Sequence, residues 1–192
     1  MPGEGPLGAS RPNGSRAAKT GARAQAEREG LCVEFVQSDM GDFLCPSAFD
    51  GAVNAFTSFS YFEDPADGHR VASNLFQSLT RGGALLIDTQ GKEVIAHTFR
   101  ERDWHEEEDG TLMLEERKMQ PGWDSIDVRW TLLKGSDQKD VALGHRLHSA
   151  NELLRWLEGA GFAQVDVYTD LEGAPYDQNA RRLVAVARRA KT

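Results

Sequence analysis

The fold is decided by the stretch FDGAVNAFTSFSYFEDPADGHRVASNLFQSLTRGGALLID, residues 49–88. Its two ends, residues 50–56 and 84–88, are short continuous apolar runs, as buried parallel strands are. Between them, residues 65–79 predict a helix, and Asp64 suits the position of its N-cap. Alternating strands and helices of this kind predict an α/β fold with a mostly parallel sheet flanked by helices.

Further elements of the same kind lie on both sides of this stretch. The sequence predicts helices at residues 17–29 and 149–160 and strands at residues 33–37, 162–169 and 183–189. Gly30 and Gly161 follow the two helices, in the position where glycine ends a helix. The Gly-Gly pair in residues 80–83 is expected to end the central helix in the same way.

Residues 95–148 have a different character, since they are rich in charges, in tryptophan and in alternating polar and apolar positions. Turn sequences such as the one at residues 109–110 separate three alternating segments. The segments are residues 111–119, 125–133 and 141–148. This pattern predicts an antiparallel β insertion in the α/β domain.

Composition limits the classes of function. The chain has 192 residues, of which 40% are hydrophobic and 27% charged, enough for the core of one α/β domain. A net charge of -8 makes nucleic acid an unexpected partner. No apolar run approaches the roughly 20 residues of a membrane span, and no secretion signal is recognised. Cys32 and Cys45 are read as reduced thiols, so we expect a cytoplasmic protein.

The N-terminal residues differ from the rest of the chain. No large apolar residue occurs between Gly8 and Gly30, and basic residues outnumber acidic ones there. We therefore predict a disordered leader at residues 1–16 and the α/β domain at residues 17–192. A transit peptide is the alternative interpretation of the leader. Residues 3–8 match G-x-G-x-x-G, but no strand precedes them, so we interpret the match as a coincidence.

Three motifs follow one another with a distinctive spacing. Asp39 follows the strand expected at residues 33–37 after one serine, the run FDGAVNAF starts at Phe49, and residues 79–88 read LTRGGALLID. Together they resemble the class I S-adenosylmethionine-dependent methyltransferases, from the third strand of that family to its C-terminus. The resemblance implies a Rossmann-like domain that uses S-adenosyl-L-methionine as cofactor and covers most of this chain.

The same resemblance assigns cofactor-binding residues. It implies that Asp39 accepts a hydrogen bond from the adenine amino group and that the backbone amide of Met40 reads the adjacent ring nitrogen. Asn54, Ala55 and Phe56 would lie beside the methionine portion and the reactive methyl group. Taken singly, Asp39 is also explained as a loop cap and Asn54 as a hydrogen-bonded core amide.

Aromatic residues dominate the segment TSFSYF, residues 57–62. Their faces can stabilise the cationic sulfonium, or they can simply pack against the next helix. The resemblance implies an acceptor pocket here, covered by the β insertion. Tyr61 and His148 are the candidates for positioning or deprotonating the acceptor. His145 and His148 are three apart, which on a strand places them on opposite faces, so no metal site is predicted.

The family's first strand and glycine-rich loop have no counterpart before residue 31, so the sequence predicts an incomplete domain with an open edge at the strand of residues 50–56. The function implied by the resemblance is methyl transfer to a small-molecule acceptor. The alternative is a catalytically inactive or truncated methyltransferase-fold protein that binds a partner, for example as a homodimer. A nucleotide-binding protein without chemistry is a third possibility.

Overall fold

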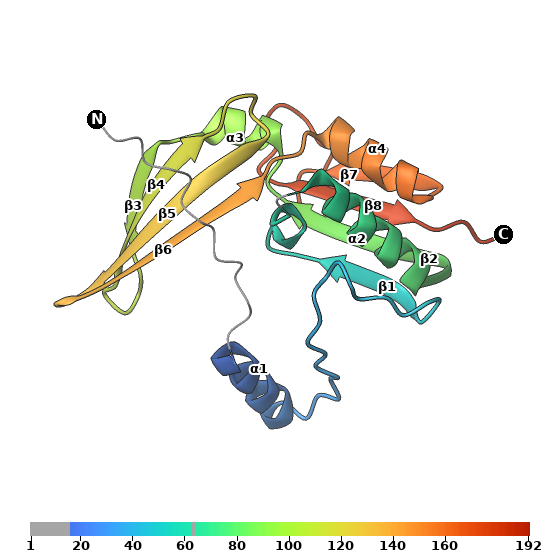
Figure 1. Cartoon of the computed structure of the whole chain (residues 1–192), viewed down its shortest axis with the longest axis horizontal. Helices are drawn as coiled ribbons and strands as arrows, with labels where there is room; N and C mark the ends of the chain where they lie inside the picture. Colours follow the sequence, from blue (N-terminus) through green and yellow to red (C-terminus); the bar gives the residue numbers. More distant parts are fainter. Residues whose placement is uncertain (1–15, 63) are drawn as a thin grey trace.

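The computed structural model describes residues 16–62 and 64–192, which form two four-stranded sheets (Figure 1). The first sheet has the strand order β1-β2-β8-β7. Its strands are β1 (Phe49–Asn54), β2 (Leu79–Thr89), β7 (Gln164–Tyr168) and β8 (Leu183–Arg188). The predicted leader at residues 1–16 and the glycine motif at residues 3–8 lie outside the described residues, apart from Arg16.

The directions of the strands confirm a mostly parallel first sheet. β1 runs parallel to β2, whereas β8 runs antiparallel to both of its neighbours, β2 and β7. Three of the four strands therefore share one direction, and only β8 opposes it. Their order differs from their order in the chain, which shows that the segments between them cross over the sheet.

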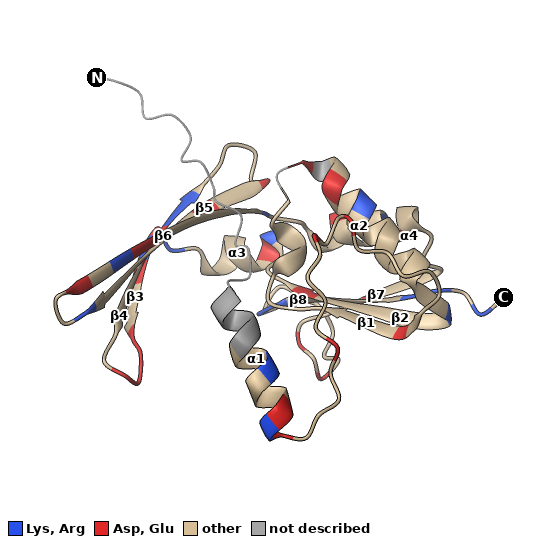
Figure 2. Cartoon of the chain, turned by 60° about the horizontal axis from the view of Figure 1, so that its bottom comes forward, with Lys and Arg blue, Asp and Glu red and all other residues tan. Residues whose placement is uncertain are grey.

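The main core lies between the first sheet and two helices, α2 (Pro65–Ser78) and α4 (Ala150–Ala160). Figure 2 shows both helices over one face of the sheet. Leu85 and Ile87 of β2 alternate toward this face and are fully buried. Leu153 and Leu157 of α4 pack against them from the helix side. The two leucines are spaced as residues on one apolar stripe of a helix are.

The helix ends follow the predicted chemistry. The Asp64 carboxylate accepts a hydrogen bond from the backbone amide of Ala66 at 2.8 Å, and Pro65 occupies the first turn of α2. Ser149 and Glu152 form a reciprocal capping box at the start of α4. Gly161 ends that helix with a φ of 110°, a value that favours glycine.

The predicted insertion is confirmed as a second, antiparallel sheet. Its strands are β3 (Arg102–Glu106), β4 (Leu112–Met119), β5 (Ser125–Lys134) and β6 (Asp137–Arg146), in chain order. A short helix, α3 (Lys92–Thr98), covers its inner face with Ile95, which packs against Ile126 and Leu147 in a second core. Neither α3 nor β3 was among the predicted elements.

Two predictions of local structure were wrong. Residues 33–37 form no strand, because a strand needs a hydrogen-bonded neighbour and none of the described segments pairs with them. They connect β1 to the helix α1 (Arg16–Arg28), which stands apart from both sheets in Figures 1 and 2. Residues 80–83 do not end a helix but lie within β2, as an irregularity in its pairing with β1.

One edge of β1 pairs with β2, and the other pairs with no strand of the described part of the chain. Val53 near the end of β1 is 72% exposed. Backbone groups of β1 therefore remain available to a further strand. No helix among the described residues is both long and apolar enough to cross a membrane.

The main core predicts a large loss of stability on truncation of Leu157. Leu157→Ala is expected to lower the free energy of unfolding by about 2–5 kcal/mol, because the side chain is fully buried between α4 and the sheet. Urea denaturation measures the change. Leu171→Ala, at an exposed loop position, is the control and should change it by less than about 0.5 kcal/mol. Equal effects of the two variants would contradict the assigned core.

Candidate functional site

The chain leaves β1 through a backbone conformation that is unusual for its residues. Phe56 and Thr57 both have a positive φ, 56° and 62°, although neither is glycine. The amide of Thr57 donates to the carbonyl oxygen of Asp88 at 3.1 Å. The hydroxyls of Ser60 and Thr89 are 3.0 Å apart and both buried. Strained backbone of this kind is held by its surroundings, and here it lies at the carboxyl ends of parallel strands, where α/β sheets bind ligands.

Three of the predicted cofactor-binding residues lie together beside this turn. The Nδ2 atom of Asn54, at the end of β1, donates to the sulfur of Met40 at 3.1 Å. Asp39 shapes the turn before β1, since its carboxylate accepts from the amide of Gly41 at 2.8 Å. Asn74 of α2 donates to the carbonyl oxygen of Gly41 at 2.8 Å and fixes this turn to the domain.

Asn54 also carries a buried polar atom without a partner. The residue is only 8% exposed, and its Oδ1 atom accepts no hydrogen bond from the described residues. Buried amide oxygens are normally hydrogen-bonded, so this atom beside the strained turn is one that a further hydrogen-bond donor would satisfy. Ala55 is half-buried, and the ring of Phe56 is 86% exposed on the same turn. The last two predicted cofactor residues therefore adjoin the first three.

The predicted catalytic residue His148 lies in a cluster of rings. Its imidazole is 6.3 Å from the ring centroid of Phe59 and 4.7 Å from that of Trp156, which also contacts His69 at 4.2 Å. Burial lowers the pKa of His148 to about 4, and the nearby Glu152 carboxylate offsets this only in part. His148 is thus a neutral, packed side chain at neutral pH.

Tyr61, the other predicted catalytic residue, contacts a different histidine. Its ring lies 5.8 Å from that of His145, at an angle of 61°. Burial raises the pKa of Tyr61 and lowers that of His145 to about 4. A neutral phenol and a neutral imidazole therefore meet where the first sheet adjoins the insertion.

The role of His145 in this contact was not recognised in the sequence. A signal was present, because Leu143 and His145 alternate along β6, with Leu147 just after it, and this places the imidazole on the inner face of the insertion. The two histidines, His145 and His148, lie in separate ring contacts. Among residues 16–62 and 64–192, no group of three His, Cys, Asp or Glu side chains could hold a metal ion.

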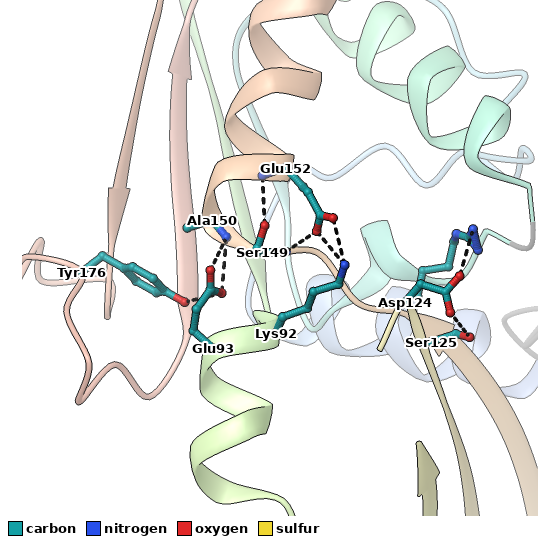
Figure 3. A network of polar contacts seen from close by, with 9 residues as sticks. Lys92, Glu93, Asp124, Ser125, Ser149, Ala150, Glu152 and Tyr176 are labelled. Atoms are coloured by element: carbon teal, nitrogen blue, oxygen red, sulfur yellow. Dashed lines mark hydrogen bonds and ion pairs between the residues drawn. The ribbon is translucent and has the colours of Figure 1, made fainter. Parts of the chain in front are cut away.

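A polar network joins the base of the insertion to the first domain (Figure 3). Lys92 of α3 contacts Glu152 of α4 at 2.9 Å. The next residue, Glu93, accepts from the amide of Ala150 at 3.1 Å and from the hydroxyl of Tyr176 at 3.2 Å. The network ties α3, at the beginning of the insertion, to the start of α4 in the first domain.

Comparison with known proteins found methyltransferases. No family model matches the chain. The protein named "Putative methyltransferase GWCH70_2453" of Geobacillus sp. (strain WCH70) is 20% identical over 181 residues, which are 88% of this chain and 70% of that protein.

Several solved methyltransferase structures share the fold of the chain. An S-adenosylmethionine-dependent methyltransferase from Clostridium acetobutylicum has a TM-score of 0.77 at 12% identity, over 92% of this chain and 72% of that one. The CcbJ methyltransferase from Streptomyces caelestis has a TM-score of 0.75 at 18% identity, over 90% and 69%. The sugar N-methyltransferase KedS8 from Streptoalloteichus sp. has a TM-score of 0.61 at 25% identity, over 88% and 67%.

The two buried histidines predict a loss of stability in acid. Between the ordinary histidine pKa of 6.5 and the lowered value of about 4, the unfolded chain binds more protons than the folded one. The free energy of unfolding should therefore fall as the pH drops through this range, by up to roughly 3 kcal/mol for each histidine. His148→Phe should remove about half of this pH-dependent loss, measured by urea denaturation at several pH values. An unchanged pH dependence in the variant would contradict a neutral, buried His148.

Proposed function

Because the chain has the fold of the class I S-adenosylmethionine-dependent methyltransferases, we propose that it transfers a methyl group from S-adenosyl-L-methionine to a small-molecule acceptor. The observation that carries the proposal is the grouping of Asp39, Met40 and Asn54 at the carboxyl end of β1, beside the strained turn. This is the position where a ligand binds to sheets of this class.

The residues present fit the cofactor chemically. Asp39 would accept a hydrogen bond from the adenine amino group, and the amide of Met40 would donate to the adjacent ring nitrogen. The unpaired Oδ1 of Asn54 suits the ammonium of the methionine portion, because a buried acceptor gains most from a charged donor. The exposed ring of Phe56 offers an aromatic face to the sulfonium. When bound, the cofactor supplies an activated methyl group.

The remaining task of the protein is to hold the acceptor in line with that methyl group. Alignment alone contributes much of the rate in such a displacement. In our proposal Tyr61 contacts the acceptor, and His148 positions the acceptor indirectly, by packing against the buried Phe59 of the segment that carries Tyr61. The name of KedS8, a sugar N-methyltransferase that is 25% identical, supports a small polar acceptor.

We also propose that the protein acts in the cytoplasm, without nucleic acid or membrane as partner. Both cysteines are free thiols, as in a reducing compartment. The negative net charge of -8 disfavours a phosphate backbone as partner.

Cofactor binding can be tested by calorimetric titration with S-adenosylmethionine and S-adenosylhomocysteine. We expect saturable binding of about micromolar affinity, weakened at least about tenfold by Asp39→Ala, because a hydrogen bond to a charged group is lost. Asp42→Ala is the matched control, since it removes an exposed carboxylate from the same turn and should not change binding. A folded sample that gives no heat at millimolar ligand would refute the proposed function.

A second candidate function, partner binding, is favoured by the surface around β1. Of the eleven exposed large hydrophobic side chains in the described residues, seven lie between residues 31 and 56. They are Leu31, Val33, Val36, Leu44, Phe49, Val53 and Phe56. Phe49 and Val53 belong to the unpaired strand β1 itself, and exposed apolar side chains on such a strand fit a partner that adds a strand to it. In this alternative the protein is a catalytically inactive homologue, and a homodimer is its simplest assembly.

Analytical ultracentrifugation tests the homodimer. If two copies pair through β1, the wild-type chain sediments as a dimer, and Val53→Lys shifts it to monomer, because a charge at the strand edge opposes pairing. Leu171→Lys is a closely matched control, since both side chains are 72% exposed, and it should leave the dimer intact. A wild-type monomer at about 100 μM would exclude a dimer of useful strength.

A further inference from the structure

A cavity of about 550 Å³ opens in the loop that joins β7 to β8. This volume is within the range of small-molecule sites in proteins. The loop starts at the carboxyl end of β7 and ends at Arg182, which contacts Asp88 near the carboxyl end of β2. The cavity therefore lies at the edge of the first sheet where α/β sheets bind ligands. Its lining residues, all within residues 169–182, include none of the candidate cofactor and acceptor residues.

Hydrogen bonds fix the loop to its surroundings at three points. The hydroxyl of Thr169 accepts from the amide of Arg181 at 3.0 Å and so joins the two ends of the loop. The Nε atom of Arg182 donates to the Asp88 carboxylate at 2.6 Å. Between these points, the hydroxyl of Tyr176 donates to a carboxylate of α3 at 3.2 Å (Figure 3). A loop held in this way needs little reordering when a ligand binds, so less of the binding free energy is lost.

One guanidinium at the cavity is available to an anion. Arg181 lines the cavity and is exposed, and its side chain has no hydrogen-bond or ion-pair partner among the described residues. Arg182 also lines the cavity, but its ion pair with Asp88 already occupies it. A guanidinium binds a carboxylate through two parallel hydrogen bonds, so a carboxylate matches Arg181 in both charge and shape.

One carboxylate at the cavity is available to a cation. Asp177 is exposed, and only its Oδ1 atom has a partner among the described residues, the amide of Asn179 at 2.7 Å. Asp170, the other lining carboxylate, is half-buried and accepts hydrogen bonds from two backbone amides, which offset more of its charge. An ammonium group is a strong hydrogen-bond donor to a carboxylate such as that of Asp177.

We propose that the cavity between β7 and β8 binds a small zwitterion, with the carboxylate of the ligand on Arg181 and its ammonium group on Asp177. The lining holds two arginines and two aspartates, so it is neutral overall but carries separated charges. A neutral molecule with separated charges complements it, whereas a simple anion or cation leaves one lining charge unpaired and lies near a like charge. Amino acids and other short aminocarboxylates belong to this class. The proposal does not depend on methyl transfer.

NMR titration of the full ¹⁵N-labelled chain tests the site, with the backbone amides of residues 169–182 as reporters. The probes are glycine, 4-aminobutyrate and 6-aminohexanoate, which differ in the separation of their charges. Each is compared with its analogue without the ammonium group (acetate, butyrate or hexanoate) and without the carboxylate (methylamine, propylamine or pentylamine). At neutral pH at least one zwitterion should bind in the low millimolar range, about fivefold or more tighter than both of its analogues.

The amides of residues 39–41, at the candidate cofactor site, should not shift with the same probe, which separates this cavity from the proposed methyl-transfer site. The proposal is overturned if no probe shifts the amides of residues 169–182. It is equally overturned if the analogues bind there as tightly as the zwitterions.

Two charge-removing variants identify the binding groups. Asp177→Asn keeps an Oδ1 atom for the amide of Asn179, so the loop should persist, while the advantage of the zwitterion over its carboxylate analogue should disappear. Arg181→Gln should weaken zwitterion binding about tenfold or more, because a hydrogen-bonded partner of opposite charge is lost.

The matched control is Arg188→Gln, which removes an exposed arginine at the opposite end of β8 and should leave binding unchanged. Spectra without ligand show whether the loop is intact in each variant. Equal effects of Arg181→Gln and Arg188→Gln, or an undiminished preference for the zwitterion in Asp177→Asn, would contradict the assigned site.

Discussion

The carboxyl end of β2 is the constraint on which the candidate site depends. β2 is hydrogen-bonded on both edges, and its last residues hold three other parts of the chain. The carbonyl oxygen of Asp88 binds the turn after β1 through Thr57, and Thr89 binds Ser60. The Asp88 carboxylate contacts Arg182 at 2.6 Å, just before β8. The position of Tyr61, one residue beyond Ser60, therefore follows from the register of the central strand.

The two buried histidines have similarly lowered pKa values but different contacts. Burial lowers the pKa of both His145 and His148 to about 4. His148 gains aromatic packing in return, from Phe59 and Trp156, whereas His145 has one ring contact and two unsatisfied nitrogens. The pKa values alone do not separate the two residues. The contacts do, since the ring of His148 packs between two aromatic side chains, whereas both nitrogens of His145 lack a hydrogen-bond partner among the described residues.

Sequence reasoning succeeded where structure is decided locally. The strands at β1 and β8 are short apolar runs, and Ser149 caps α4, so neighbouring residues were enough to predict them. It failed at residues 33–37, because an apolar run becomes a strand only beside a partner. The candidate cofactor residues followed from motif order, and Asn54 does meet Met40. The contact of Tyr61 with His145 depends on how two sheets dock, which no local pattern contains.

The insertion departs from the first domain and returns to it at nearly one point. Gly91, before α3, forms a β-bridge with His148, after β6, and the amide of Lys92 donates to the carbonyl oxygen of His148 at 3.0 Å. A segment whose two ends adjoin can be lengthened, shortened or replaced without moving β2 or α4. The sheet that carries His145 can thus change in length or sequence without displacing the half of the molecule around Asn54.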